Sequence, residues 1–233
     1  MATITKYLII ITVAIASLGI YWFLGSSEVV KRGQGVTVAT STQSTITIVA
    51  FGDSLTAGYG LPISESYPAQ LESALRAQGL SVTVINSGVS GETTRGNLER
   101  AAFIRAQNPD IVLLGIGGND ALRALPLTET QKNMSDTIAI LKSGDRPPVI
   151  FLLEMQAPLN AGLIYKREFD ALYQTIATAN SIKLLPFITT KVFSNSDNVL
   201  PDRIHLNKVG YAQVINLYLL EPVAKQVTVL VTS

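Results

Sequence analysis

The chain has 233 residues, of which 47% are hydrophobic and 15% are charged, a composition that excludes a disordered protein and suits one medium-sized domain. Eighteen basic and seventeen acidic residues give a formal charge of +1, so the sequence shows no electrostatic signature of nucleic-acid binding. Because there is no cysteine and only one histidine, disulfides, thiolate nucleophiles and metal sites with two histidine ligands are excluded within this chain.

An uncharged apolar run near the amino terminus predicts a membrane-spanning helix. Residues 7–24 contain no charged residue, and at ~1.5 Å per residue a helix of this length nearly spans a hydrocarbon core of ~30 Å. Tyr21 and Trp22 lie near one end, where amphipathic aromatic side chains favour the membrane interface. We expect residues 1–32 to be an uncleaved membrane anchor; the alternative is a signal segment cleaved after Ser27, which would give a secreted protein.

The charged tail ahead of this run favours an amino terminus inside the cytoplasm. The rest of the chain is then expected outside the cytoplasm of a bacterial-type cell, in the periplasm or the extracellular space. Residues 33–45 are uncharged and rich in Gly, Ser, Thr and Gln, which is typical of a flexible linker. Residues 46–233 are expected to form the folded domain.

Apolar β-rich runs alternate with helix-like segments throughout this domain. Alternation of this kind predicts βαβ units, and therefore a three-layer α/β domain with helices on both faces of a five-stranded, mainly parallel sheet. Residues 226–233 are expected to be either a frayed tail or an added edge strand. The expected strands are 45–51, 81–86, 110–117, 149–154 and 182–187, and the expected helices are 66–80, 92–107, 128–143, 165–180 and 207–225.

Functional side chains collect at the carboxyl ends of parallel strands, and Ser54 follows the first strand in the string Gly-Asp-Ser-Leu. An isolated Gly-Asp-Ser is ordinarily a turn or a helix cap. A nucleophilic serine needs a base, for which His205 is the only histidine available. Asp202 lies three residues before it, so a turn lets the carboxylate accept the Nδ1 hydrogen while Nε2 faces the serine. Otherwise, a lone histidine ahead of a helix is a surface or capping residue.

Acyl transfer also needs hydrogen-bond donors for the developing oxyanion. Gly88 lies just beyond the second strand, where the absence of a side chain lets its backbone N–H approach a ligand. Asn119 lies just beyond the third strand and offers its side-chain amide. Together with the Ser54 N–H, these groups are the expected oxyanion hole. Taken singly, Gly88 is better explained as a turn glycine, and Asn119 is better explained as a turn or cap residue.

Other motifs of hydrolases and nucleotide-binding proteins are missing from the sequence. The α/β-hydrolase elbow Gly-x-Ser-x-Gly is absent around Ser54, and neither a dinucleotide fingerprint nor a Walker motif occurs, so no cofactor is expected. Asp53 and Asp120 invite an interpretation as an acid pair, but we expect each carboxylate to accept backbone N–H groups in its own loop. The segment 154–165 is either an acyl pocket lined by Leu159, Leu163 and Ile164 or only a long strand-to-helix connection.

Taken in chain order, these blocks resemble the SGNH (GDSL) hydrolase superfamily, whose name lists the Ser, Gly, Asn and His of four such positions. Ser54, Gly88, Asn119 and His205 match them, with Asp202 in the last block. The strings GDSLTAGYG, LGIGGND and LLPF look most like the bacterial thioesterase I, lysophospholipase and arylesterase group. The resemblance implies a flavodoxin-like sheet with a shallow, open active site. One departure is Leu206, where that group usually carries proline.

The resemblance implies a serine esterase that hydrolyses carboxylic esters or thioesters of acyl chains through a Ser-His-Asp triad and an acyl-enzyme. The expected partners are a small-molecule acyl substrate, possibly derived from lipid, and a membrane contacted through residues 7–24. Two alternatives stay open: a deacetylase of O-acetylated envelope polysaccharide, and a non-catalytic ligand-binding module on the same fold.

Overall fold

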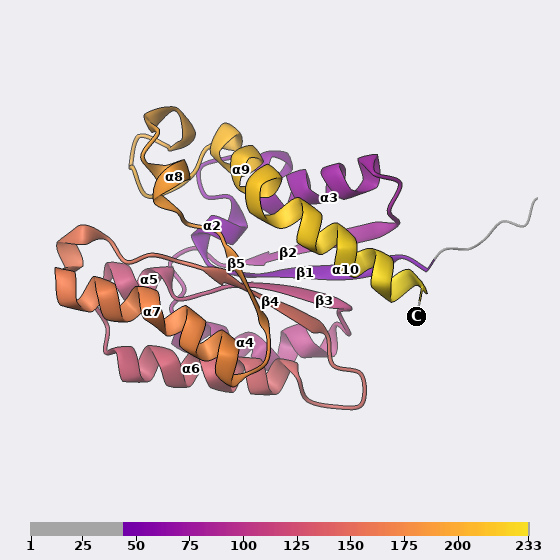
Figure 1. The fold of residues 1–233 in the computed structure, drawn as a ribbon, viewed down its shortest axis with the longest axis horizontal. Coiled ribbons are helices and arrows are strands. Elements are labelled where there is room, and N and C mark those ends of the chain that lie inside the picture. Colours follow the sequence, from indigo (N-terminus) through magenta and orange to yellow (C-terminus); the bar gives the residue numbers. More distant parts are fainter. Residues whose placement is uncertain (1–43, 233) are drawn as a thin grey trace, which may run out of the picture. The chain divides into compact units, whose positions relative to one another are not determined.

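Five parallel strands form the centre of the fold, in the order β2-β1-β3-β4-β5 (Figure 1). The computed structural model describes residues 44–232. This strand order is that of flavodoxin-like sheets, and the order reverses between β1 and β3. The strands are β1 Ile46–Gly52, β2 Val82–Gly88, β3 Ile111–Gly115, β4 Val149–Glu154 and β5 Lys183–Pro186. The predicted three-layer α/β class with a five-stranded parallel sheet is therefore confirmed.

Helices cover both faces of the sheet (Figure 1). One face carries α3 Tyr67–Ala77, α9 Lys208–Val214 and α10 Leu220–Thr232, with the π-helical turn η4 Ile215–Leu219 joining the last two. The other face carries α4 Thr94–Ala106, α6 Leu127–Leu141 and α7 Leu163–Ala179. Short helices follow the strands: α2 Ser54–Ala57, η1 Ile63–Glu65, α5 Gly118–Leu122, η2 Leu159–Ala161, α8 Thr190–Phe193 and η3 Ser196–Asn198.

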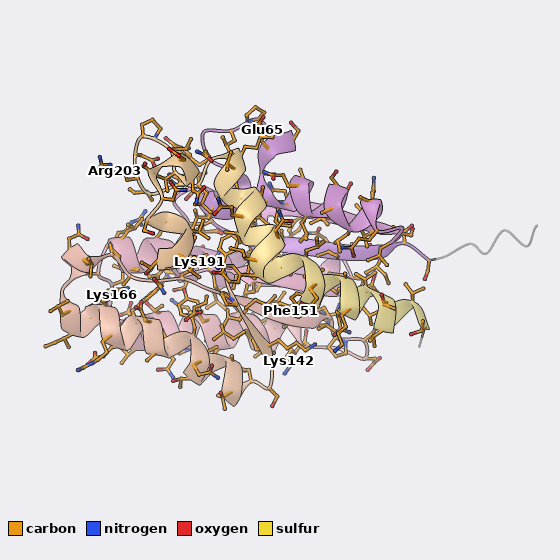
Figure 2. All side chains as sticks on the ribbon, turned by 45° about the horizontal axis from the view of Figure 1, so that its top comes forward. Glu65, Lys142, Phe151, Lys166, Lys191 and Arg203 are labelled. Carbon is orange, nitrogen blue, oxygen red and sulfur yellow. The ribbon has the colours of Figure 1, made fainter. Side chains whose placement is uncertain are left out.

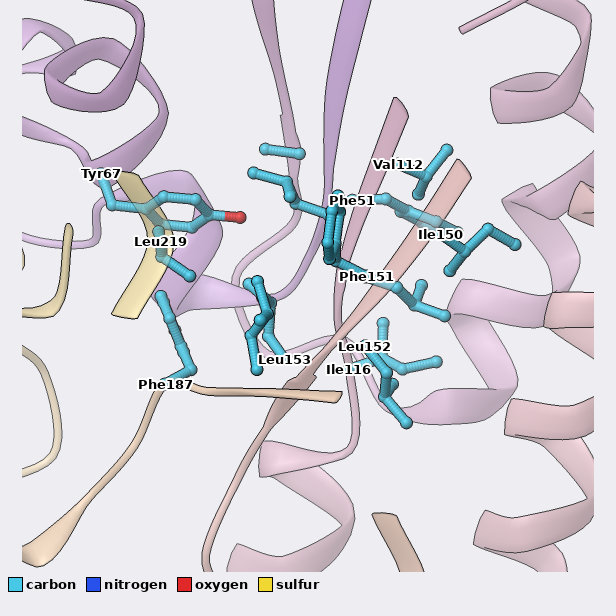
Figure 3. Packing of buried hydrophobic residues seen from close by; sticks show 14 of the residues in the cluster. Phe51, Tyr67, Val112, Ile116, Ile150, Phe151, Leu152, Leu153, Phe187 and Leu219 are labelled. Carbon is cyan, nitrogen blue, oxygen red and sulfur yellow. The ribbon is translucent and has the colours of Figure 1, made fainter. Parts of the chain in front are cut away.

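The core lies on both faces of the three central strands. Phe51 on β1 and Phe151 on β4 are fully buried and lie within one continuous apolar cluster (Figure 3). Aromatic rings join the helical layer to the sheet, since Tyr67 contacts both Phe187 and Tyr211. Charged side chains such as Lys142, Lys191 and Arg203 are exposed instead, and Figure 2 shows Arg203 at the edge of the molecule. Burial on both faces explains why β3 and β4 are continuous apolar runs rather than alternating ones.

The end of the chain differs from expectation. Residues 226–232 were expected as a frayed tail or an edge strand, but they form the last turns of α10. Val223 and Val227, four residues apart, are both buried against the core, and this spacing suits a helix. Within residues 44–232, the continuous helix Lys208–Thr232 is also the one segment long and apolar enough to cross a membrane by length and composition, with a mean hydropathy of 1.4. Packing on the core accounts for its buried side, which includes Leu219 and Val223, whereas Leu217 and Val229 are exposed.

The expected anchor in residues 1–32 lies outside the described residues. Most of the expected linker, residues 33–45, also lies outside them. The domain organisation therefore stays a prediction.

Candidate active site

The site begins where β1 meets α2 at the carboxyl edge of the sheet. Ser54 is the first residue of α2, and the Asp53 side chain caps this helix by accepting the Leu55 N–H at 3.0 Å. Gly52 is required for space, because a Cβ there would lie 2.3 Å from the carbonyl oxygen of Gly115 on β3. Close packing of β1 on β3 thus fixes where Ser54 emerges from the sheet.

The structure brings Ser54, His205 and Asp202 together in a continuous hydrogen-bonded chain. His205 Nε2 lies 2.8 Å from Ser54 Oγ, and His205 Nδ1 lies 2.7 Å from Asp202 Oδ2. The other carboxylate oxygen of Asp202 accepts the N–H groups of Ile204 and His205 at 2.9 and 3.0 Å. Desolvation acts to raise the pKa of Asp202, but the hydrogen bonds from His205 and Ile204 outweigh it and lower that pKa. The carboxylate therefore stays ionised beside the imidazole.

The loop that carries His205 is fixed at both ends. Leu200 donates its N–H to the His205 carbonyl at 2.8 Å, and Val199 forms an antiparallel bridge with Leu206. Leu206 is fully buried, so a packed leucine fills the position where the family resemblance led us to expect proline. Asn207 then caps α9 by accepting the N–H groups of Val209 and Gly210. Packing and capping give this loop the rigidity that a proline would supply elsewhere.

Tyr59 contacts the imidazole, a contact that the sequence analysis missed. Its ring centroid lies 4.6 Å from that of His205, although the side chain is 51% exposed. Gly58 and Gly60 flank it, both in the left-handed backbone region with φ of 77°. A Cβ on Gly58 would lie 2.6 Å from Ser66 Cβ, and one on Gly60 would lie 2.8 Å from Leu200 Cδ1. The string Gly-Tyr-Gly was the available signal for this turn.

Asn119 is linked to the serine loop by a hydrogen bond to Asp53, the residue before Ser54. It is the second residue of α5 and nearly buried, and its Nδ2 donates to Asp53 Oδ2 at 3.5 Å. Asp53 is almost fully buried; desolvation raises its pKa to about 6, against the lowering effects of the Leu55 N–H, His205 and Asn119. The predicted Asn119 side chain is thus held at the serine end of the site.

Asp53 and Asp120 are not arranged as an acid pair. Asp53 accepts a backbone N–H within its own loop, as expected. Asp120 instead accepts the backbone N–H of Thr94 at 2.8 Å and the Thr94 hydroxyl at 2.6 Å, and it also accepts the Thr130 hydroxyl at 3.3 Å. Its carboxylate therefore joins α5 to α4 and α6 rather than stiffening its own loop alone.

The structure corrects the expectation for Gly88. Its N–H already donates to Asn86 Oδ1 at 3.0 Å, so this donor is not open to a ligand. A Cβ on Gly88 would lie 2.1 Å from the Ala57 nitrogen, which makes it a close-packing glycine at the end of β2.

Gly91, three residues later, has the properties expected of Gly88. Its φ is 81°, it is exposed, and its N–H has no hydrogen-bond partner among residues 44–232. The loop around it is anchored, because Arg123 donates to the Gly91 carbonyl at 3.0 Å and Arg100 pairs with Glu92. The available signal was a second glycine in the same loop, in the string Ser-Gly-Glu-Thr.

A mostly apolar pocket of about 410 Å³ adjoins the site. Leu55 and Ile204, the neighbours of Ser54 and His205, both line it. Further apolar lining comes from Leu122, Met155, Ala157, Pro158, Leu159, Ile188 and Phe193.

Of the predicted pocket residues, Leu159 lies in this lining, while Leu163 and Ile164 do not. These two are 77% and 67% exposed. They lie at the start of α7, whose buried face is formed further along by residues such as Phe169 and Tyr173, so they point away from the core. No group of three or more His, Asp or Glu in the described part of the chain is arranged to hold a metal ion.

Comparisons with known proteins agree with this geometry. Residues 50–213 match the model of the GDSL-like Lipase/Acylhydrolase family. An arylesterase of Vibrio mimicus is 33% identical over 72% of this chain and 84% of its own length. The thioesterase 1/protease 1/lysophospholipase L1 of Escherichia coli K12 is 31% identical over 70% and 76%.

Solved structures of esterases are also similar to this chain. AlinE4, an esterase of the SGNH-hydrolase family, is 39% identical, with a TM-score of 0.65 over 79% of this chain and 98% of its own. The psychrotrophic esterase EstA from Pseudoalteromonas sp. is 27% identical, with a TM-score of 0.69 over 80% and 99%. The chain therefore belongs to the GDSL-like lipase/acylhydrolase family of SGNH hydrolases and is an ester-bond hydrolase.

Proposed function

We propose that this hydrolase cleaves carboxylic esters or thioesters of acyl chains, with Ser54 as nucleophile, His205 as general base and acid, and Asp202 as the residue that orients the imidazole. The observation that carries the proposal is the continuous chain from Asp202 through His205 to Ser54, at 2.7 and 2.8 Å. Both distances are within hydrogen-bond reach, which proton transfer between these groups requires.

The reaction takes two steps. His205 Nε2 accepts the proton as Ser54 Oγ attacks the carbonyl carbon, and Asp202 stabilises the resulting imidazolium through Nδ1. His205 then gives that proton to the leaving alcohol or thiol, and an acyl-enzyme remains on Ser54. A water molecule activated by the same imidazole releases the acid and restores the free serine.

The oxyanion is stabilised by the Ser54 N–H, the Asn119 side-chain amide and a backbone N–H from the loop after β2. Gly91 is the better candidate for this last donor, because the Gly88 N–H is already bonded to Asn86. Asn119 is fixed by Asp53, so one of its two amide hydrogens stays available to substrate. We expect Asn119→Ala to lower kcat by ~10²–10³-fold. An Asn119→Ala enzyme with the wild-type kcat would remove this residue from the oxyanion hole.

The substrate class is supported by the apolar pocket beside Ser54 and by the names of the relatives, an arylesterase and a thioesterase/lysophospholipase. An apolar pocket of about 410 Å³ has the size and chemistry to take an acyl chain. A membrane anchor in residues 1–32, with the catalytic domain outside the cytoplasm, would keep the enzyme near lipid-derived esters.

The test is hydrolysis of a substrate panel by the full chain beside a Ser54→Ala control. The panel contains p-nitrophenyl esters of increasing chain length, acyl-CoAs, lysophospholipids and acetylated sugars. We expect turnover of acyl esters or thioesters by the wild type and none by Ser54→Ala. Activity confined to acetylated sugars would favour a polysaccharide deacetylase, and equal activity of the two proteins would refute the nucleophile assignment.

A further inference from the structure

The charged residues of the pocket are all of one sign. Its lining contains two cationic side chains, Lys166 and Arg203, and no carboxylate. Lys166 is neutralised locally, because its Nζ lies 2.7 Å from Asp170 Oδ2. Arg203 forms no ion pair with any residue in the described range 44–232. The pocket therefore holds one uncompensated positive charge in otherwise mostly apolar surroundings.

The backbone fixes where this charge lies. Arg203 sits between Asp202 and His205 in the left-handed region, with φ of 57°, which is uncommon for a residue with a side chain. Its N–H donates to the Leu200 carbonyl at 2.9 Å, while the next two N–H groups are bound by Asp202. The turn that orients the imidazole thus also places Arg203 in the lining of the pocket, on the same side of the molecule as Lys166 (Figure 2).

The rest of the lining is suited to an apolar chain. Leu122, Leu159 and Ile204 line the pocket and are nevertheless exposed, so apolar surface is available at its mouth. Covering this surface with a hydrocarbon chain is favourable in proportion to the apolar area removed from water. A ligand that satisfies both features has an apolar body and a negatively charged group.

We propose that the pocket takes the chain of an amphiphilic ester whose anionic group, a carboxylate or a phosphate, is bound by Arg203. This rests on the proposed esterase function and narrows its substrate class to anionic amphiphiles. Arginine suits the role because its planar guanidinium matches both carboxylate and phosphate in two-point hydrogen bonding. Arg203 does not reach the reacting atoms by this argument, so its effect belongs to substrate binding rather than to the chemical step.

The test compares matched charged and neutral substrates. One pair is mono-p-nitrophenyl suberate and p-nitrophenyl octanoate, which differ at the far end of the acyl group. A second pair is lysophosphatidylglycerol and monoacylglycerol, which differ in the leaving group. In the wild-type full chain we expect a lower KM for the charged member of at least one pair. Which pair responds tells whether the anion belongs to the acyl group or to the leaving group.

Arg203→Asn removes the charge while keeping a residue that tolerates the left-handed backbone. We expect it to raise the charged-to-neutral KM ratio of the responsive pair by about five- to tenfold, the loss of one partly exposed charge-assisted contact. Arg203→Lys keeps the charge but not the planar guanidinium, so it should keep only part of the preference, and added salt should weaken the preference. Lys191→Gln is the matched control, because Lys191 is an exposed cation on α8 outside the pocket lining, and its ratio should stay at the wild-type value.

Three outcomes would overturn the proposal: equal KM for charged and neutral members of both pairs, no change of the ratio in Arg203→Asn, or the same change in Lys191→Gln. The last would indicate a general field rather than a contact. Ser54→Ala separates these results from a failure of the proposed function. If Ser54→Ala is inactive on octanoate while the Arg203 result is negative, the esterase assignment stands and only the anionic preference is lost.

Discussion

Gly88 and Gly91 lie in the same loop and lack a side chain for different reasons. At Gly88 a Cβ would lie 2.1 Å from the Ala57 nitrogen, so Gly88→Ala would force β2 and α2 apart. At Gly91 no heavy atom lies closer than the 4.0 Å of Arg123 Nη2, and only the φ of 81° opposes a side chain. Space decides the first position and backbone strain the second.

We therefore predict that Gly88→Ala lowers the free energy of unfolding by about 3 kcal/mol or more, since backbone must move. Gly91→Ala should cost only about 1–2 kcal/mol, the strain of a left-handed residue. Urea unfolding of the two variants beside the wild type measures both values. A Gly88→Ala protein as stable as the wild type would contradict the packing assignment.

We predict that Tyr59 is a positioning residue, because its ring contacts that of His205, the proposed base. Its hydroxyl has no hydrogen bond within the described range, so the contact is made by the ring. We predict that Tyr59→Leu lowers kcat/KM by about tenfold through a less well-fixed imidazole. Tyr59→Phe, which keeps the ring, should restore it.

Measurements of stability distinguish a role of Tyr59 in positioning His205 from a role in holding the fold together. Because Tyr59 is half exposed, both variants should unfold at the wild-type urea concentration. If the two variants lose activity equally, the hydroxyl matters and the ring contact is not the cause.

Among single residues, the sequence predicted those whose partner lies nearby in the chain or is the only residue of its type. Asp202 and His205 are three residues apart, and His205 is the only histidine that Ser54 can use. The choice between Gly88 and Gly91 depended on a side chain, Asn86, that captures one of the two N–H groups. Such competition is decided by loop geometry, which no local pattern encodes.

Between elements, a single hydrogen bond joins the helix after His205 to the helix that begins at Ser54. The buried Tyr211 hydroxyl on α9 donates to the Leu55 carbonyl on α2 at 2.8 Å. The two halves of the site come from residues about 150 positions apart, so this contact helps to set their distance. It lies on the face of the sheet that α3 also covers.

Tyr211→Phe should lower the free energy of unfolding by about 1–2 kcal/mol, because it leaves a buried carbonyl without its partner. Tyr218→Phe is the control: its hydroxyl lies 3.3 Å from Thr189 Oγ1 and is only partly buried, so the loss should stay below about 0.5 kcal/mol. Urea unfolding measures both losses. Equal losses would show that the α9–α2 hydrogen bond contributes no more to stability than the hydroxyl contact of Tyr218.

The order of elements was well predicted, because each βαβ unit carries its own pattern. β4 Val149–Glu154 matches the expected strand at both ends, and the other strands differ by one or two residues at each end. The tail was misjudged because Val227, Val229 and Val231 alternate like a strand. The four-residue spacing of Leu219, Val223 and Val227 prevailed once the core was present to bury it.

On the scale of the whole molecule, two carboxylates of the site act on stability in opposite directions with pH. The pKa of Asp202 is lowered, so its contribution is present above its ordinary value of 3.8 and is lost as the pH falls through the lower, folded-state pKa. The pKa of Asp53 is raised by burial to about 6. The folded protein therefore binds a proton there that the unfolded chain has already released.

For Asp53 the sign follows from that extra proton. Its contribution to stability is fully present below 3.8, its unfolded value, and is lost as the pH rises to about 6. A difference of about two pKa units corresponds to about 3 kcal/mol, so ionised Asp53 costs the folded enzyme on that order at neutral pH. At that cost the carboxylate caps α2 and accepts a hydrogen bond from the Asn119 side chain.

We predict that Asp53→Asn changes how the free energy of unfolding depends on pH, and does not only shift it by the same amount at every pH. Because a neutral amide has no proton to lose, the free energy of unfolding of the variant minus that of the wild type should rise between about pH 4 and pH 6 and stay level above. In this difference the contributions of Asp202 and of the other groups common to both proteins cancel. Urea unfolding at a series of pH values measures the difference. The same variant should also show a reduced kcat, because Asn119 loses its ionised partner. A difference that is flat from pH 4 to pH 7 would mean that Asp53 titrates near its ordinary pKa in the folded enzyme.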